Sequence, residues 1–172
     1  GKNNGYPCPD FTVLRHPQKL LKPARILTED TRIKLEKILL NAEDTTSLGI
    51  LFALFTGVRI GELCGLRWED VDFQSLTVSI KRTVERIADL DPNTTKKTKV
   101  VLSEPKTENS IRIIPLPGFL AEYLEMRKRD PKFYLLTGKR KYTEPHQFYV
   151  RYQNYLEKHG IENYTFHSLR HT

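Results

Sequence analysis

The sequence has 172 residues, of which 38% are hydrophobic and 28% charged, with a formal net charge of +7, as in one globular domain with a polyanionic partner. No apolar run approaches the roughly 18 residues of a membrane-spanning helix, and no apolar signal core follows Gly1, so we expect neither membrane insertion nor secretion. Two cysteines, Cys8 and Cys64, are too few for a disulfide scaffold and fit a reducing compartment.

Residues 1–25 are expected to form a linker rather than part of the folded domain. Four prolines, Pro7, Pro9, Pro17 and Pro23, interrupt this segment, so it contains no stretch with the apolar spacing of a helix. The sequence therefore predicts that the domain starts at residue 26.

The first half of the domain is predicted to be helical. Thr28 is a good N-cap. The helix that follows it carries a stripe of Ile33, Lys37 and Leu40, and its apolar face is broadened by Leu35, Ile38, Leu39 and Ala42. A second helix after Thr45–Thr46 is apolar almost all round, which predicts burial, and Gly57 can form its left-handed C-cap. A third, short helix is expected to carry residues 59–66.

The middle of the chain changes to a strand pattern. Residues 76–81 alternate apolar and polar side chains, and further strands are expected near 99–102 and 110–114. Residues 105–109 lie between the last two strands and are expected to form a hairpin connection. These strands predict a small three-stranded antiparallel sheet.

Helical patterns return toward the C-terminus. One helix is predicted near Pro117 and another from Thr143 to Gly160, and residues 166–172 could begin a last one. The expected fold class is α+β, a mostly helical domain with the small antiparallel sheet described above.

Basic side chains are concentrated in the later part of the chain. Residues 28–75 hold nine acids against five bases, whereas residues 125–141 hold seven bases against two acids. Clusters of this kind can neutralise DNA phosphates and release counterions, although they can also be a solvated surface with no partner. The candidate backbone contacts are Lys96, Lys97, Lys99, Arg127, Lys128, Arg129, Lys139, Arg140 and Lys141.

Arg59 follows the tight turn that ends the most apolar helix, so the base of its side chain is held rigidly. A guanidinium offers a planar fork that suits two phosphate oxygens. Glu62, three residues later, shares a helix face with Arg59 and could orient it. The alternative is a purely structural Arg–Glu pair.

Lys106 lies in the expected hairpin connection, where a lysine could reach a bound phosphodiester and protonate a departing alkoxide. The alternative is an ordinary exposed turn lysine.

His167 and Arg170 are three residues apart, and on a helix they share a face, as do His167 and His171. An imidazole beside a fixed cation suits a transition state whose charge is spread over phosphoryl oxygens. Two histidines at i and i+4 can also bind zinc, but Ser168 replaces the glutamate that follows the first histidine in metalloproteases. A structural pair of partly buried histidines is the remaining alternative.

Three segments in this order, residues 56–63, 105–116 and 165–172, resemble the catalytic domain of tyrosine recombinases, the integrases of phages and transposons. The resemblance extends over about residues 26–172, and the run 66–72 resembles the family's link into its sheet. It implies site-specific recombination that integrates or excises a mobile element through a 3′-phosphotyrosyl DNA intermediate. It also implies that residues 1–25 are the remnant of an upstream DNA-clamping domain.

The resemblance assigns catalytic roles to Arg59, Lys106, His167 and Arg170, and supporting roles to Glu62 and His171. The two arginines would hold the non-bridging phosphate oxygens and stabilise the transition state. Lys106 would be the general acid for the 5′-oxygen, and His167 would assist proton transfer. Neither a metal nor a cofactor is expected.

The family's nucleophilic tyrosine follows the His-x-x-Arg segment, and all eight tyrosines of this chain precede Arg170. The nucleophile is therefore expected beyond Thr172, and we expect a fragment that cannot cleave DNA by itself.

The resemblance implies double-stranded DNA as partner and a homotetramer of the full protein on two duplexes, in a bacterial cytoplasm. It is compatible with a monomeric state of this fragment. The main rival hypothesis is a basic DNA-binding module without catalysis, and a zinc enzyme using His167 and His171 is the third.

Overall fold

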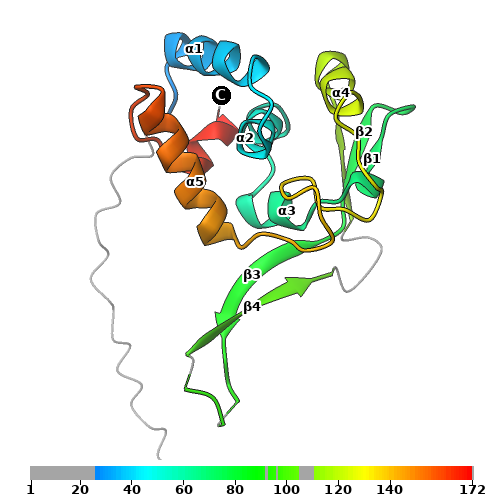
Figure 1. Cartoon of the computed structure of the whole chain (residues 1–172), viewed down its shortest axis with the longest axis vertical. Coiled ribbons are helices and arrows are strands. Elements are labelled where there is room, and N and C mark those ends of the chain that lie inside the picture. The colour runs from blue at the N-terminus through cyan, green and yellow to red at the C-terminus, as the bar shows by residue number, and fades with distance from the viewer. Residues whose placement is uncertain (1–25, 92, 96, 105–110, 172) are drawn as a thin grey trace, which may run out of the picture.

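In the computed structural model, helices occupy both ends of the described chain and strands occupy its middle (Figure 1). The structure describes residues 26–91, 93–95, 97–104 and 111–171. The elements are α1 (Glu29–Leu40), α2 (Thr45–Thr56), α3 (Ile60–Gly65), η1 (Trp68–Asp70), β1 (Val71–Asp72), β2 (Thr77–Ile80), β3 (Thr83–Ala88), β4 (Thr98–Ser103), β5 (Arg112–Pro115), α4 (Gly118–Glu125), α5 (Pro145–Lys158) and η3 (Phe166–His171). In the part of the chain just defined, no helix is long and apolar enough to cross a membrane.

The α+β class predicted from the sequence is confirmed. Helices α1, α2 and α5 gather around η3, while the β3–β4 ribbon extends away from them (Figure 1). The linker expected over residues 1–25 lies outside the described residues.

Local capping fixes the first two helices. The Thr28 hydroxyl accepts from the Thr31 N–H at 3.3 Å, and the Asp44 carboxylate caps α2 by accepting from the N–H groups of Thr46 and Ser47. Gly57 ends α2 at φ 63°, the left-handed conformation that the sequence predicted.

The buried helix surfaces follow the apolar residues with one exception. Helix α2 is buried along most of its length, as its composition predicted. On α1 the core-facing residues are Leu35 and Leu39, both of which belong to the apolar face expected from the sequence. Ile33 and Leu40, which were also assigned to that face, are exposed.

A three-stranded antiparallel sheet is present, but its strands differ from the expected ones. Its order is β1–β2–β5, and the strand expected near residues 99–102 pairs instead with β3 in a separate two-stranded ribbon. Strand β3 was not predicted, because only Val84 among its residues is buried and the rest lack the apolar alternation of a core strand.

The connection over residues 105–109 is therefore not a hairpin, because β4 and β5 do not pair with each other. Ser103 pairs with Thr83, and Arg112 pairs with Ile80. Only residues 81–82 separate β2 from β3, whereas residues 104–111 separate the two partner strands. Residues 105–110 themselves lie outside the described residues.

Two glycines let α3 approach the backbone of the ribbon closely. A Cβ at Gly61 would lie 2.7 Å from the Val84 carbonyl oxygen, and one at Gly65 would lie 3.0 Å from the Arg82 carbonyl oxygen. The two glycines are one helical turn apart from each other, so they lie on the same face of α3, the face that packs on the start of β3. This packing fixes the residues of α3 relative to the strands.

We predict that Gly61→Ala lowers the free energy of unfolding by about 1–3 kcal/mol, because the added methyl meets backbone atoms that cannot rotate away. The measurement is urea denaturation of the chain. Gly118→Ala is the matched control: it adds the same methyl to a helix where nothing lies within 4 Å, and it should leave stability equal or higher. Equal stability of the two variants would contradict this account.

Candidate functional site

The turn between α2 and α3 presents Arg59 to solvent. Gly57 reverses the chain, Val58 is completely buried, and Arg59 is the extended N-cap residue of α3. The Arg59 side chain is 63% exposed, so its backbone is anchored while its guanidinium faces outward.

Glu62 lies beneath Arg59 and is nearly withdrawn from water, with its side chain 10% exposed. Its Oε2 accepts from the backbone N–H of Arg59 at 2.8 Å, as the third residue of a capping box does. Its Oε1 accepts from Nη1 of Arg59 at 3.1 Å. The Arg59–Glu62 contact expected from the sequence is thus present.

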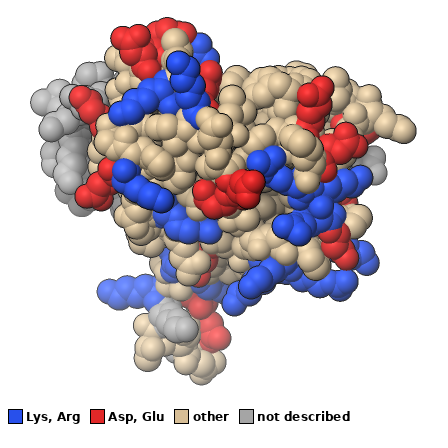
Figure 2. All heavy atoms as spheres, turned by 45° about the horizontal axis from the view of Figure 1, so that its top comes forward, with Lys and Arg blue, Asp and Glu red and all other residues tan. Residues whose placement is uncertain are grey.

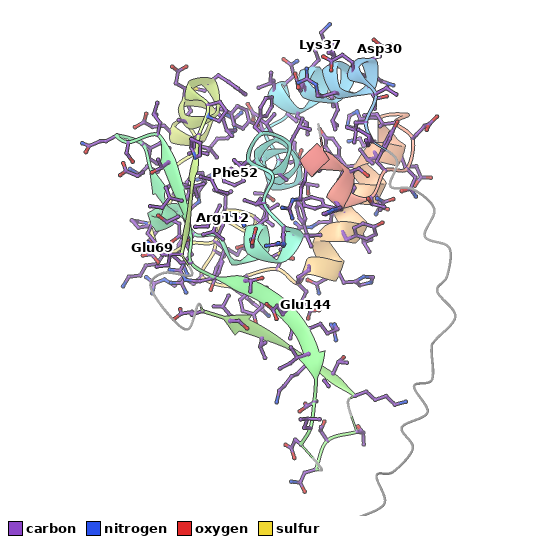
Figure 3. All side chains as sticks on the ribbon, turned by 180° about the vertical axis from the view of Figure 1, so that it is seen from behind. Asp30, Lys37, Phe52, Glu69, Arg112 and Glu144 are labelled. Atoms are coloured by element: carbon purple, nitrogen blue, oxygen red, sulfur yellow. The ribbon has the colours of Figure 1, made fainter. Side chains whose placement is uncertain are left out.

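A third member of this cluster was missed by the sequence analysis. Nη2 of Arg112, on β5, donates to Glu62 Oε2 at 2.9 Å (Figure 3). The two residues are 50 positions apart, and the sequence carried no signal for their contact beyond an arginine in an alternating strand.

His167 and Arg170 lie on the open side of η3. This element is a 3₁₀ helix, in which residues three apart superpose along the axis. Phe166 and Leu169 point into the core, whereas His167 is exposed and Arg170 half-buried. The expected shared face of His167 and Arg170 agrees with this geometry.

The expected alignment of His167 with His171 involves a side chain that lies outside the described residues. Over the residues that the structure describes, which leave out the His171 side chain, no group of three His, Cys, Asp or Glu could hold a metal ion.

Aromatic packing holds η3 against α5 and α2. The Phe166 ring meets Phe148 and Tyr152 edge-to-face, at centroid distances of 5.8 and 5.3 Å. Nε2 of Gln153 donates to the Tyr164 carbonyl oxygen at 2.9 Å, just before η3. Since η3 also packs on α2, the helix that leads into Arg59, its two polar residues are carried by the same rigid core (Figure 1).

Lys106 and Lys96 lie outside the described residues, but the flanks of the Lys106 segment are described. On one side Glu104 lies 3.8 Å from Nε of Arg82, and on the other Arg112 contacts Glu62. Arg82 itself forms a 2.6 Å ion pair with Asp70, whose side chain is 1% exposed. Both flanks are thus tied to the α3 and η1 region.

Two of the basic clusters meet at one hollow. Lys99 and Lys141 line it together with Arg86 and Glu144, so the β3–β4 ribbon and the segment before α5 contribute to one surface. Arg86 pairs with Glu144 at 2.6 Å, and Lys99 pairs with Asp89 at 3.1 Å. Figure 2 shows Lys and Arg side chains gathered over the lower part of the face that it draws.

The remaining candidates are placed differently. The Arg127 guanidinium lies 3.7 Å from the centre of the Tyr123 ring, and the Lys128 ammonium lies 5.0 Å from that of Phe73. These two cations are therefore held near α4 and the β1–β2 turn, not at the hollow. Four others are exposed: Lys97, Arg129, Lys139 and Arg140.

Cys64 offers no reactive thiol in this setting. It is fully buried in α3, and burial raises its pKa to about 12.

Comparison with known proteins places this architecture among described ones. The profile of the phage integrase family matches residues 26–172. The chain is 32% identical over 139 residues to a tyrosine recombinase XerC-like protein of Caldanaerobacter subterraneus subsp. tengcongensis, covering 71% of this chain and 36% of that protein. It is 34% identical over 110 residues to the prophage integrase IntR of Escherichia coli, covering 64% of this chain and 22% of that protein.

Two solved structures share the fold at low sequence identity. The Tn1549 transposon integrase in complex with a circular intermediate DNA has a TM-score of 0.62 and 20% identity, covering 90% of this chain and 53% of that one. The XerA recombinase has a TM-score of 0.59 and 24% identity, covering 91% and 50%. The chain thus spans about half or less of each protein compared.

The Arg82–Asp70 pair gives a stability prediction. Arg82→Met leaves the buried Asp70 carboxylate without its closest cation, so the free energy of unfolding should fall by about 3 kcal/mol in urea denaturation. Arg32→Met, which breaks the more exposed pairs of Arg32 with Glu29 and Glu36 on α1, should change it by less than about 1 kcal/mol. Similar losses in both variants would show that burial of Asp70 is not what matters.

Proposed function

The chain belongs to the phage integrase family, the tyrosine recombinases, and on this basis we propose that it serves in site-specific recombination of DNA that integrates or excises a mobile element. The observation that carries the proposal is the exposed guanidinium of Arg59, held on a buried carboxylate, with His167 and Arg170 on the open side of a helix packed against the same core. Such fixed cations can stabilise charge that develops on a phosphoryl group.

The proposed reaction is a transesterification. A tyrosine oxygen attacks the DNA phosphorus, a 3′-phosphotyrosyl bond forms, and the bond to the 5′-oxygen breaks. In this scheme Arg59 and Arg170 bind the two non-bridging oxygens, and Lys106 gives its proton to the leaving 5′-oxygen. Attack by a 5′-hydroxyl of another strand reverses the step, so bond energy is conserved and neither ATP nor a metal is required.

The remaining roles are those of positioning. We propose that Glu62 orients Arg59, that His167 assists proton transfer, and that His171 supports the site from the last turn of η3. The pre-set geometry lowers the entropy cost of bringing the reacting groups together.

Double-stranded DNA is the proposed partner. The DNA in the Tn1549 integrase complex and the basic hollow with Lys99 and Lys141 support it. Phosphate contacts of these lysines would position the duplex without reading its sequence. A homotetramer acting on two duplexes is proposed for the full-length protein.

We propose that none of the described tyrosines is the nucleophile. Five are buried, namely Tyr123, Tyr134, Tyr152, Tyr155 and Tyr164. Burial raises the pKa of Tyr155 to about 12 and that of Tyr152 further still, which makes each phenol a poorer source of phenolate.

The 172-residue chain should form no covalent adduct with a suicide DNA substrate carrying its recombination site, since no tyrosine of this chain follows Arg170, where the family places its nucleophile. Denaturing gels of the mixture measure this. The full-length protein is the positive control, and a tyrosine-linked adduct on the short chain, located by mass spectrometry, would refute the assignment.

In the full-length protein, Arg170→Lys and Lys106→Ala should each reduce strand transfer at least about 100-fold, because both remove stabilisation specific to the transition state. Binding to the same duplex should weaken by less than about 5-fold, because only one phosphate contact of many is altered. Strand-transfer assays measure the rate, and gel-shift assays measure the affinity for the duplex.

Arg32→Ala, on α1 away from these residues, is the control and should alter neither number. Equal loss of binding and strand transfer in the two site variants would favour the rival function, a DNA-binding module without catalysis.

A further inference from the structure

Glu62 divides its two carboxylate oxygens between two arginines. Oε1 accepts from Arg59 at 3.1 Å, and Oε2 accepts from Arg112 at 2.9 Å as well as from the Arg59 backbone N–H at 2.8 Å. The paired, two-bond contact that an arginine and a carboxylate form when left to themselves is thus not made between Glu62 and Arg59.

This division leaves most of the Arg59 guanidinium available. Only Nη1 contacts Glu62, and toward the residues that the structure describes its other nitrogens make no hydrogen bond. The charge balance also favours phosphate binding. One carboxylate and two guanidiniums have a net charge of about +1, whereas the charges of Glu62 and Arg59 alone would cancel.

We propose that Arg112 is a positioning residue of the reaction, which holds Glu62 so that this carboxylate orients Arg59 without consuming both its terminal nitrogens. Without Arg112, Oε2 of Glu62 would keep only the bond from the Arg59 backbone N–H, and its remaining lone pair could accept a second bond from the Arg59 guanidinium. The guanidinium would then meet a phosphate with fewer free donors and less net charge. The inference rests on the proposed function for Arg59.

The contact also couples two parts of the site. Arg112 is the first residue of β5, directly after the segment that contains Lys106, and it pairs with Ile80 of β2. Its side chain therefore ties the start of β5 to the carboxylate that contacts Arg59.

The first test uses Arg112→Gln and Arg112→Lys in the full-length protein. Arg112→Gln should lower the single-turnover rate of DNA cleavage at least about 10-fold while changing the Kd for the duplex by less than about 3-fold. Arg112→Lys retains the cation that attracts Glu62 and should recover at least about a third of the rate. Wild-type cleavage by Arg112→Gln, or no recovery with lysine, would overturn the proposal.

The second test needs no catalysis. In the 172-residue chain, the ¹⁵N-edited NMR signal of the Arg59 side chain should shift in Arg112→Gln and not in Arg32→Gln, a matched loss of a guanidinium that pairs with glutamates elsewhere. An unmoved Arg59 signal overturns the positioning role alone. Absence of DNA cleavage by the wild-type full-length protein would instead overturn the proposed function, and this inference with it, whatever the NMR arm shows.

Discussion

A single carboxylate, that of Glu62, carries the arrangement on which the rest of the candidate site depends. It closes the first turn of α3, fixes the exposed Arg59 and receives Arg112 from a strand 50 residues away. A carboxylate so shielded from water is stable only when cations and hydrogen-bond donors surround it, so the charge of Glu62 favours the contact between α3 and β5. The glycines of α3 make that possible, because they let the helix sit directly on the start of β3.

Much of the helical framework could be predicted because its determinants are local. Thr28 and Gly57 act through atoms within a few residues of themselves, and the apolar composition of α2 alone requires burial. The strands were harder to predict from the sequence. Strand β3 is stabilised by pairing with β4 rather than by a buried face, so its sequence shows little alternation, and a hairpin was inferred where two separate pairings exist.

The same distinction applies to the site. The Arg59–Glu62 contact was predictable because the two residues are three apart at the start of α3, where a capping box brings them together. The contacts of Arg112 with Glu62 and of Arg82 with Asp70 depend instead on the strands that carry the arginines. His167 and Arg170 were expected on one helical segment, but their spacing did not show that this segment is a 3₁₀ helix rather than an α-helix.

The three-stranded sheet and the β3–β4 ribbon are joined by two connections of different length, and this difference affects which insertions the chain can accept. Two residues join β2 to β3, while eight, residues 104–111, span the gap on the partner side, and both ends of that longer path are secured by ion pairs. Lengthening a connection between two fixed ends costs little free energy, because the entropy lost on closing a loop grows only logarithmically with loop length. Insertions and deletions between Glu104 and Arg112 should therefore leave the strand register of the three-stranded sheet and of the β3–β4 ribbon unchanged.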